Sequence, residues 1–338
     1  MPVGVRPTVV WMPNIEIVLA LVNLTEEGTR YQSRAVHPLR RAVWLRYDNK
    51  RRSPAVVETA ALIKEGFWLD SLLEVALAAD SLPKVGFSYA LPRETAARAG
   101  LGLAEEGLTR LTRYLDAAAA FTLDGDTLDF LRTHGDSYRT AVDEYETALG
   151  DLSWTDALEG YFGAAHRSIL CAASLLMPAG FSFGLSLETP EGPLACHVTG
   201  PFIEPDGRLT FAAPGQAAVC AERELVRAYI RPALRRAALA ARSFVRVFEQ
   251  GRDGFARLGY REPLDCLEDH LVQAVQCRLL ARRGEKPAAD ALLRFDEDGG
   301  FVYERPLALG LEDYELHRAD FPTLDDFLPR LLDSFARN

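Results

Sequence analysis

The stretch AERELVRAYIRP, residues 221–232, decides how the second half of the chain is interpreted. Its apolar residues recur at the three- and four-residue spacing of an amphipathic helix. Arg223 and Arg227 are four residues apart and therefore share a face of that helix, with Glu224 beside the first of them. Pro232 is expected to end the helix. An ordinary surface helix with Glu–Arg pairs at this spacing would give the same pattern.

The chain before this stretch predicts an α+β fold that is predominantly helical. Residues 168–212 alternate apolar and polar side chains around the turn pairs Pro190–Gly192 and Pro205–Gly207, which indicates a small antiparallel sheet next to the 217–230 helix. The opening TVVWMPNIEIVLALVNL (8–24) predicts a strand followed by a helix with Asn14 at its N-cap.

Proline and glycine residues mark where the other helices should begin and end. Residues 53–79 have a helical pattern that Ser53 and Pro54 start well, as N-cap and first helical residue. Beyond residue 217 we expect helices with breaks near Gly251, Pro263 and Gly284. The sequence therefore predicts one unit over 1–338, with a helical part (1–165), a small sheet (166–215) and a helical part (216–338).

Composition excludes several classes of function. The net charge of −10 argues against nucleic acid as the partner, because phosphate binding depends on clustered lysine and arginine. Five cysteines without a C-x-x-C pair predict reduced, buried thiols. No signal-peptide pattern and no apolar run long enough to cross a bilayer is present, so we expect a cytoplasmic protein with no membrane partner. The excess of arginine over lysine indicates a GC-rich bacterial genome.

Six segments in a fixed order carry a resemblance to a known family. They are PNIEIVLALVNLT (13–25), HPL (37–39), LEGYFG (158–163), ERELVRAYIRP (222–232), LGYREPLDCLEDHLVQAVQCRL (258–279) and GGFVYERPLALGLEDYELHRADFPTLDDFLPRLL (299–332). Together they resemble an uncharacterised bacterial family, known as a domain of unknown function and containing predicted zinc metallopeptidases of the gluzincin kind. The resemblance implies a gluzincin-like core and a site on two helices.

Such peptidases carry H-E-x-x-H, in which two histidines bind zinc and the glutamate activates water. The resemblance places the histidine positions at Arg223 and Arg227, the general base at Glu224 and the third, acidic ligand at Asp269 or else Glu268. Arginine stays protonated and offers donors only, so it cannot replace histidine on zinc. We therefore expect no metal cofactor and a catalytically degenerate homologue, a pseudoenzyme that acts by binding a peptide or protein.

The same substitution suggests an ion pair in place of the metal. Facing carboxylates without a cation repel each other and are costly to bury. We therefore expect Arg227 to pair with Asp269 or Glu268 across the two helices.

Two alternatives remain at this stage. The first is an active metal-dependent hydrolase that uses Glu224, Asp269 and a relocated ligand such as His270 or His197, or a zinc site of Cys266, His270 and Cys277 on one helix. The second is an interaction module that uses a basic helix, since arginine recurs at helical spacing at residues 231, 235, 242 and 246.

Overall fold

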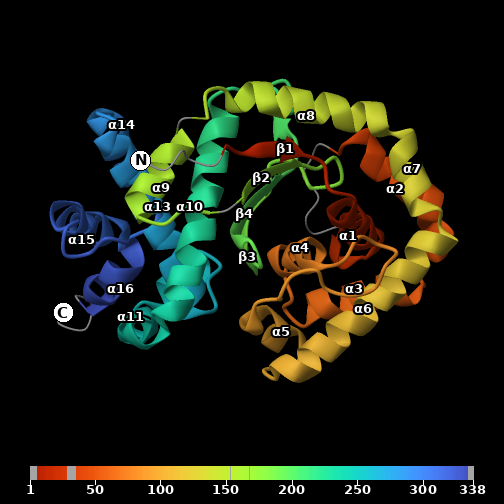
Figure 1. Ribbon diagram of the computed structural model, residues 1–338, viewed down its shortest axis with the longest axis horizontal. Helices are drawn as coiled ribbons and strands as arrows, with labels where there is room; N and C mark the ends of the chain where they lie inside the picture. Colours follow the sequence, from red (N-terminus) through yellow and green to blue (C-terminus); the bar gives the residue numbers. More distant parts are fainter. Residues whose placement is uncertain (1–5, 29–35, 153, 167, 334–338) are drawn as a thin grey trace. The chain divides into compact units, whose positions relative to one another are not determined.

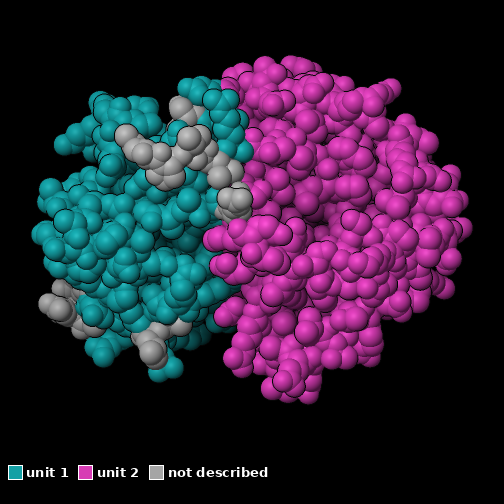
Figure 2. Space-filling model, viewed as in Figure 1, with its two compact units in different colours: residues 1–6, 151–166, 222–338 teal, residues 7–150, 167–221 magenta. Residues whose placement is uncertain are grey.

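A computed structural model describes residues 6–28, 36–152, 154–166 and 168–333 (Figure 1). The chain divides into two compact units, coloured separately in Figure 2. Unit 1 comprises residues 1–6, 151–166 and 222–338, and unit 2 comprises residues 7–150 and 167–221. Both units are made of segments that are distant in the sequence.

Unit 2 contains a four-stranded sheet surrounded by helices. Its strands are β1 (Thr8–Val10), β2 (Ser168–Ala173), β3 (Ser182–Thr189) and β4 (Gly192–Thr199), in the order β1-β2-β4-β3, and a separate hairpin joins β5 (Phe202–Ile203) to β6 (Leu209–Thr210). Its helices are α1 (Pro13–Leu24), α2 (Pro38–Tyr47), α3 (Pro54–Lys64), α4 (Leu69–Ala78), α5 (Arg93–Ala99), α6 (Ala104–Asp124), α7 (Thr127–Thr133) and α8 (Gly135–Leu149), with a 3-10 turn at Asp48–Lys50.

The described part of unit 1 consists of helices and the segments that connect them. It contains α9 (Trp154–Phe162), α11 (Ala238–Gln250), α12 (Arg252–Arg257), α13 (Pro263–Arg282), α14 (Lys286–Gly299), α15 (Glu304–Leu316) and α16 (Leu324–Asp333). Helix α10 (Gln216–Arg236) begins in unit 2 and continues into unit 1. Helix α13 packs against α11, α14 and α15. Its residues 266–277 are largely buried, so α13 forms the centre of this unit.

The predominantly helical α+β class is confirmed. Antiparallel pairing is present between β3 and β4 and between β5 and β6, at the two predicted turns. The four-stranded sheet is mixed, however, because β1 pairs parallel with β2 and β2 pairs parallel with β4. Six consecutive residues of β4, Leu194–Thr199, are buried, as expected of a strand that is covered on both faces.

Helix boundaries differ from the prediction in three places. Met12, and not Asn14, is the N-cap of α1; the Asn14 amide instead donates 2.9 Å to the Asp80 carbonyl, and its oxygen accepts from the Leu82 amide at 3.0 Å. The single helix expected over 53–79 is two helices, separated at Gly66, whose φ of 90° favours glycine. Pro232 lies inside α10, which continues for one more turn.

The other predicted boundaries are confirmed. Ser53 is the N-cap of α3, with Pro54 at its first position. Gly251 ends α11, Pro263 is the first residue of α13, and Gly284 follows the end of α13 with a φ of 84°.

Glu16 on α1 is an ionisable group in the core of unit 2. Its side chain is fully buried, the Tyr138 hydroxyl donates to Oε2 at 2.8 Å, and the Leu176 amide donates to the same oxygen at 3.3 Å. The pKa of Glu16 is raised to about 7, because the effect of burial outweighs that of the hydrogen bonds from Ser174, Tyr138 and Leu176, which lower it. The folded protein therefore holds this proton up to a higher pH than the unfolded chain.

We predict that Glu16→Gln reduces the loss of stability that the wild type shows as the pH rises from about 4.5 to 7. Because the folded protein binds this proton more tightly than the unfolded chain, its free energy of unfolding falls as the pH rises through this window. The shift from 4.5 to about 7 corresponds to about 3 kcal/mol. Chemical unfolding measured at several pH values checks this. Glu188→Gln, on the exposed part of β3, is the control and should retain the wild-type pH dependence.

Candidate functional site

The candidate site is formed by α10 and α13 within unit 1. Arg223, Arg227 and Arg231 follow each other at four-residue spacing and lie along one face of α10. Glu268 and Asp269 lie in the first half of α13, which Pro263 begins. The arginine row spans two turns of α10 and precedes Pro232, and Arg227 and Arg231 contact the acidic pair.

Arg227 is the centre of the site. Its Nε donates to Oε2 of Glu224 at 3.0 Å, its Nη1 donates to Oε1 of Glu268 at 3.0 Å, and Nη1 also contacts Oδ1 of Asp269. The Arg227 side chain is 17% exposed, and that of Glu224 is 3% exposed. The predicted ion pair across the two helices is confirmed, and it involves both candidate acids.

Arg231 extends the cluster by one turn. Its Nε donates to Oε2 of Glu268 at 3.0 Å, and its Nη2 donates to Oε1 of the same carboxylate at 3.0 Å, which is bidentate recognition. The sequence pattern grouped Arg231 with the arginines at 235, 242 and 246 in a solvent-exposed basic stripe, because these residues recur at helical spacing. The four-residue spacing from Arg227 was the signal that could have placed it here.

Tyr260 was also missed. Its hydroxyl donates to Oδ2 of Asp269 at 2.7 Å from the segment that joins α12 to α13. Burial, together with the charge of Asp269, raises the pKa of the Tyr260 hydroxyl well above its usual range, so it remains a donor. Tyr260 lies within the 258–279 segment that carries the family resemblance, but nothing in that pattern assigned it a role in the site.

Arg223 is at the more exposed end of the row. Its Nε donates to Oε1 of Glu224 at 3.1 Å, and its side chain is 40% exposed. Its charge also acts on Asp296 of α14, where it lowers a pKa that burial raises. Both oxygens of Glu224 therefore accept from a guanidinium, one from Arg223 and one from Arg227.

The charges of this α10–α13 cluster balance. Three arginines (Arg223, Arg227, Arg231) face three carboxylates (Glu224, Glu268, Asp269). Burial alone would raise the pKa of Glu268, but the charges of Arg231 and Arg227 outweigh it and bring that pKa to about 2. The same carboxylates keep the pKa of Arg227 well above its usual range despite burial. Glu268 and Arg227 are therefore both ionised at neutral pH.

These residues do not fit a zinc ion of the peptidase type. Arg223 and Arg227, the positions at which the resemblance implies histidine ligands, carry guanidinium groups, which have no lone pair for a metal. The acids that would act as base and ligand accept hydrogen bonds from those same groups. In the described ranges, no three His, Cys, Asp or Glu side chains come together in a way that could hold a metal ion.

The alternative ligands lie at separate places. Cys266 Sγ is 3.6 Å from His270 Nδ1, whereas Cys277 Sγ donates to Glu304 Oε1 at 3.0 Å. Burial raises the pKa of Cys266 to about 12 and lowers that of His270, so the buried thiol and imidazole are both neutral. His197 belongs to unit 2, where its Nδ1 is 2.6 Å from the Tyr145 hydroxyl.

The basic stripe is divided in the structure. Arg231 points into the α10–α13 cluster, and only Arg242 and Arg246 are clearly exposed, both on α11. Arg236 pairs with Asp325 through Nε at 2.7 Å. The exposed basic surface is thus smaller than the sequence pattern suggested. In the part of the chain that the structure describes, no helix is long and apolar enough to cross a membrane.

We predict that Arg227→Leu destabilises the protein strongly. The substitution leaves buried carboxylates without their shared cation, and removing one partner of such a cluster costs about 3–5 kcal/mol. Arg242→Leu is the matched control, because Arg242 is exposed, and it should change stability by less than about 0.5 kcal/mol. Chemical unfolding of the three proteins measures both values, and equal effects of the two substitutions would contradict the prediction.

We further predict that Glu268 makes stability pH-dependent in acid. Its folded pKa of about 2 lies below the ordinary 4.5, so its contribution is complete above about pH 4.5 and is lost as the pH falls toward 2. The shift corresponds to about 3 kcal/mol. In Glu268→Gln this part of the pH dependence should disappear, so that the free energies of unfolding of wild type and variant become equal at low pH. Chemical unfolding at several pH values measures them. Asp320→Asn, an exposed acid, should follow the wild type at every pH.

Comparison with known proteins identifies the family of this chain. Residues 37–334 match the family described as a domain of unknown function, DUF4932. No curated protein matches the chain. No solved structure matches it either. Since the matched region covers most of the 338 residues, including both helices of the candidate site, the chain belongs to the DUF4932 family.

Proposed function

We propose that this protein is a catalytically degenerate homologue of zinc metallopeptidases, which works without metal and binds a peptide or protein partner. The observation that supports this best is the α10–α13 cluster, in which Arg227 contacts Glu224, Glu268 and Asp269. These are the positions that the gluzincin resemblance assigns to one zinc ligand, the general base and the acidic third ligand. The proposal includes a gluzincin-like core and a bacterial, cytoplasmic protein.

A charge count supports the replacement of a metal. A peptidase site of this kind combines two neutral histidines with a zinc ion of charge +2. Here Arg223 and Arg227 together supply the same +2. With the further charge of Arg231, the three carboxylates of α10 and α13 are compensated without an ion.

Glu224 is poorly suited to act as a base in this arrangement. A general base needs a lone pair directed at the proton it removes, with a pKa near the working pH. Both Glu224 oxygens accept from guanidinium groups, and hydrogen bonds to the charged form favour that form. This observation disfavours an active hydrolase built on Glu224 and Asp269, and leaves binding as the function to test.

Restoring the motif tests the proposal. We predict that the double variant Arg223→His/Arg227→His, which recreates H-E-x-x-H, binds about one equivalent of zinc, because its two histidines are one helical turn apart and position 227 lies against Glu268 and Asp269. Wild-type protein, purified without a histidine tag and offered zinc, should contain almost none. Elemental mass spectrometry measures the metal, and a zinc-dependent rise in the melting temperature of the variant gives a second readout.

A matched variant separates a rebuilt site from chance binding. Arg223→Gln/Arg227→Gln removes the same charges without adding ligands, so it should bind no zinc and gain no stability from it. Zinc in the wild type, lost again in Glu224→Ala, would overturn the metal-free proposal. Failure of the histidine variant to take up zinc while it remains folded would contradict the gluzincin geometry.

A further inference from the structure

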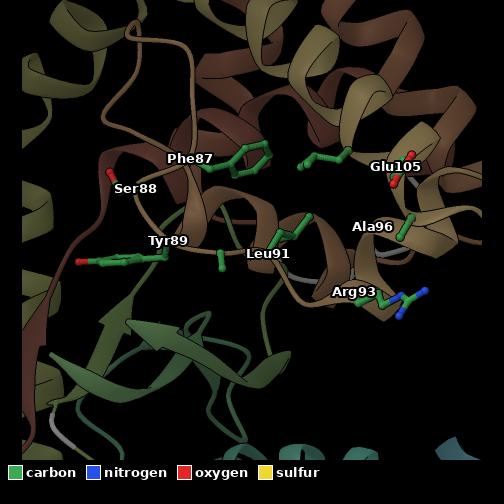
Figure 3. A pocket seen from close by; sticks show the side chains of 10 residues that line it. Phe87, Ser88, Tyr89, Leu91, Arg93, Ala96 and Glu105 are labelled. Atoms are coloured by element: carbon green, nitrogen blue, oxygen red, sulfur yellow. The ribbon is translucent and has the colours of Figure 1, made fainter. Parts of the chain in front are cut away.

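Unit 2 carries a pocket that is separate from the α10–α13 cluster. It has a volume of about 420 Å³ and lies between residues 87–91 and the helices α5 and α6 (Figure 3). Figure 3 shows the side chains of Phe87 and Leu91 projecting into it, and Ala96 on the wall formed by α5. The walls are mainly apolar, so an apolar group would gain free energy by entering it.

The rim of this pocket carries one cation and one anion. Arg93, at the start of α5, and Glu105, in the first turn of α6, are both exposed. Figure 3 shows both at the end of the pocket away from Tyr89. Among the described residues, neither side chain has an ion-pair partner. Each is therefore available to a charge brought by another molecule.

The turn that joins α5 to α6 presents a leucine under backbone strain. Leu101, between two glycines, has a φ of 52°, and its side chain is 80% exposed. The left-handed region is unfavourable for a residue with a Cβ, and glycine or asparagine would be expected there. Leu103 and Leu108 nearby are also exposed, at 57% and 44%. An exposed leucine in a strained turn is unfavourable for the chain by itself. A contact that buries this side chain against another molecule would offset that cost.

We propose that this face of unit 2 is a symmetric contact between two copies of the chain. In it, Leu101 of each copy enters the pocket of the other, and Arg93 of each pairs with Glu105 of the other. A two-fold contact requires a surface that is complementary to itself. The α5–α6 region supplies an apolar projection, an apolar pocket, a cation and an anion, which are the parts that such a contact needs.

The charges favour a second copy over other occupants. A small apolar ligand would fill the pocket but leave Leu101 and Leu103 in water. An unrelated protein would need its own pair of opposite charges to match Arg93 and Glu105, whereas a second copy supplies both. Since each copy carries a net charge of −10, two copies repel in general, and the two ion pairs offset that repulsion where the surfaces meet.

Sedimentation equilibrium over a wide concentration range tests the contact. We expect the wild type to dimerise reversibly, and Leu101→Asn to raise the dissociation constant on the order of a hundredfold, since two buried leucines are lost per dimer. Asparagine tolerates the left-handed region, so the melting temperature at low concentration should not fall. Leu123→Asn, an exposed leucine at the other end of α6, is the control and should leave dimerisation unchanged.

A charge exchange makes the test specific to this geometry. Arg93→Glu and Glu105→Arg should each weaken self-association, because each places like charges opposite one another at both sides of the two-fold axis. Mixed in equal amounts, the two variants should form a heterodimer with both ion pairs restored. A monomeric wild type at every concentration, an unaffected Leu101→Asn dimer, or no recovery on mixing would each overturn the proposal.

Discussion

The guanidinium group of Arg227 is the constraint on which the arrangement of α10 and α13 depends. It lies among three carboxylates that come from two helices, in surroundings that are largely shielded from water. Taking any of these groups out of water is costly, and the cost is offset only while all of them remain together. A single charge thus determines which residues of the two helices can face each other, because a shift along either helix would separate it from at least one acid.

Much of this cluster could be predicted from the sequence, since it depends on spacing along helices. The four-residue interval between Arg223 and Arg227 places them on one face, and the need to compensate Glu268 and Asp269 predicted the pairing that the structure shows. Arg231 was assigned to the basic stripe because its spacing also fits residues 235, 242 and 246. The same spacing from Arg227 places it against Glu268 in the structure.

The features that local patterns could not reveal are contacts between distant segments. Asn14 has the residue type of an N-cap, yet its amide bonds with backbone more than sixty residues away. Parallel pairing of β1 with β2 joins the two separate stretches of the chain that make up unit 2. The alternation within each strand does not indicate which strand lies beside it. Tyr260 contacts Asp269 from the loop before α13, and the sequence of this loop does not indicate that contact.

Membership of a family of unknown function does not by itself assign chemistry, and the site has to be judged by its own residues. A zinc ion and a pair of arginines can both balance buried acids, but they differ in permanence. Zinc dissociates, and its affinity follows pH, whereas guanidinium charges are covalently attached and remain protonated. With its pKa at about 2, Glu268 stays ionised across the whole neutral range. Under the proposed function, the two helices therefore stay packed together at any metal concentration. A binding protein can work with such a site, whereas a zinc hydrolase needs the reactivity of the metal.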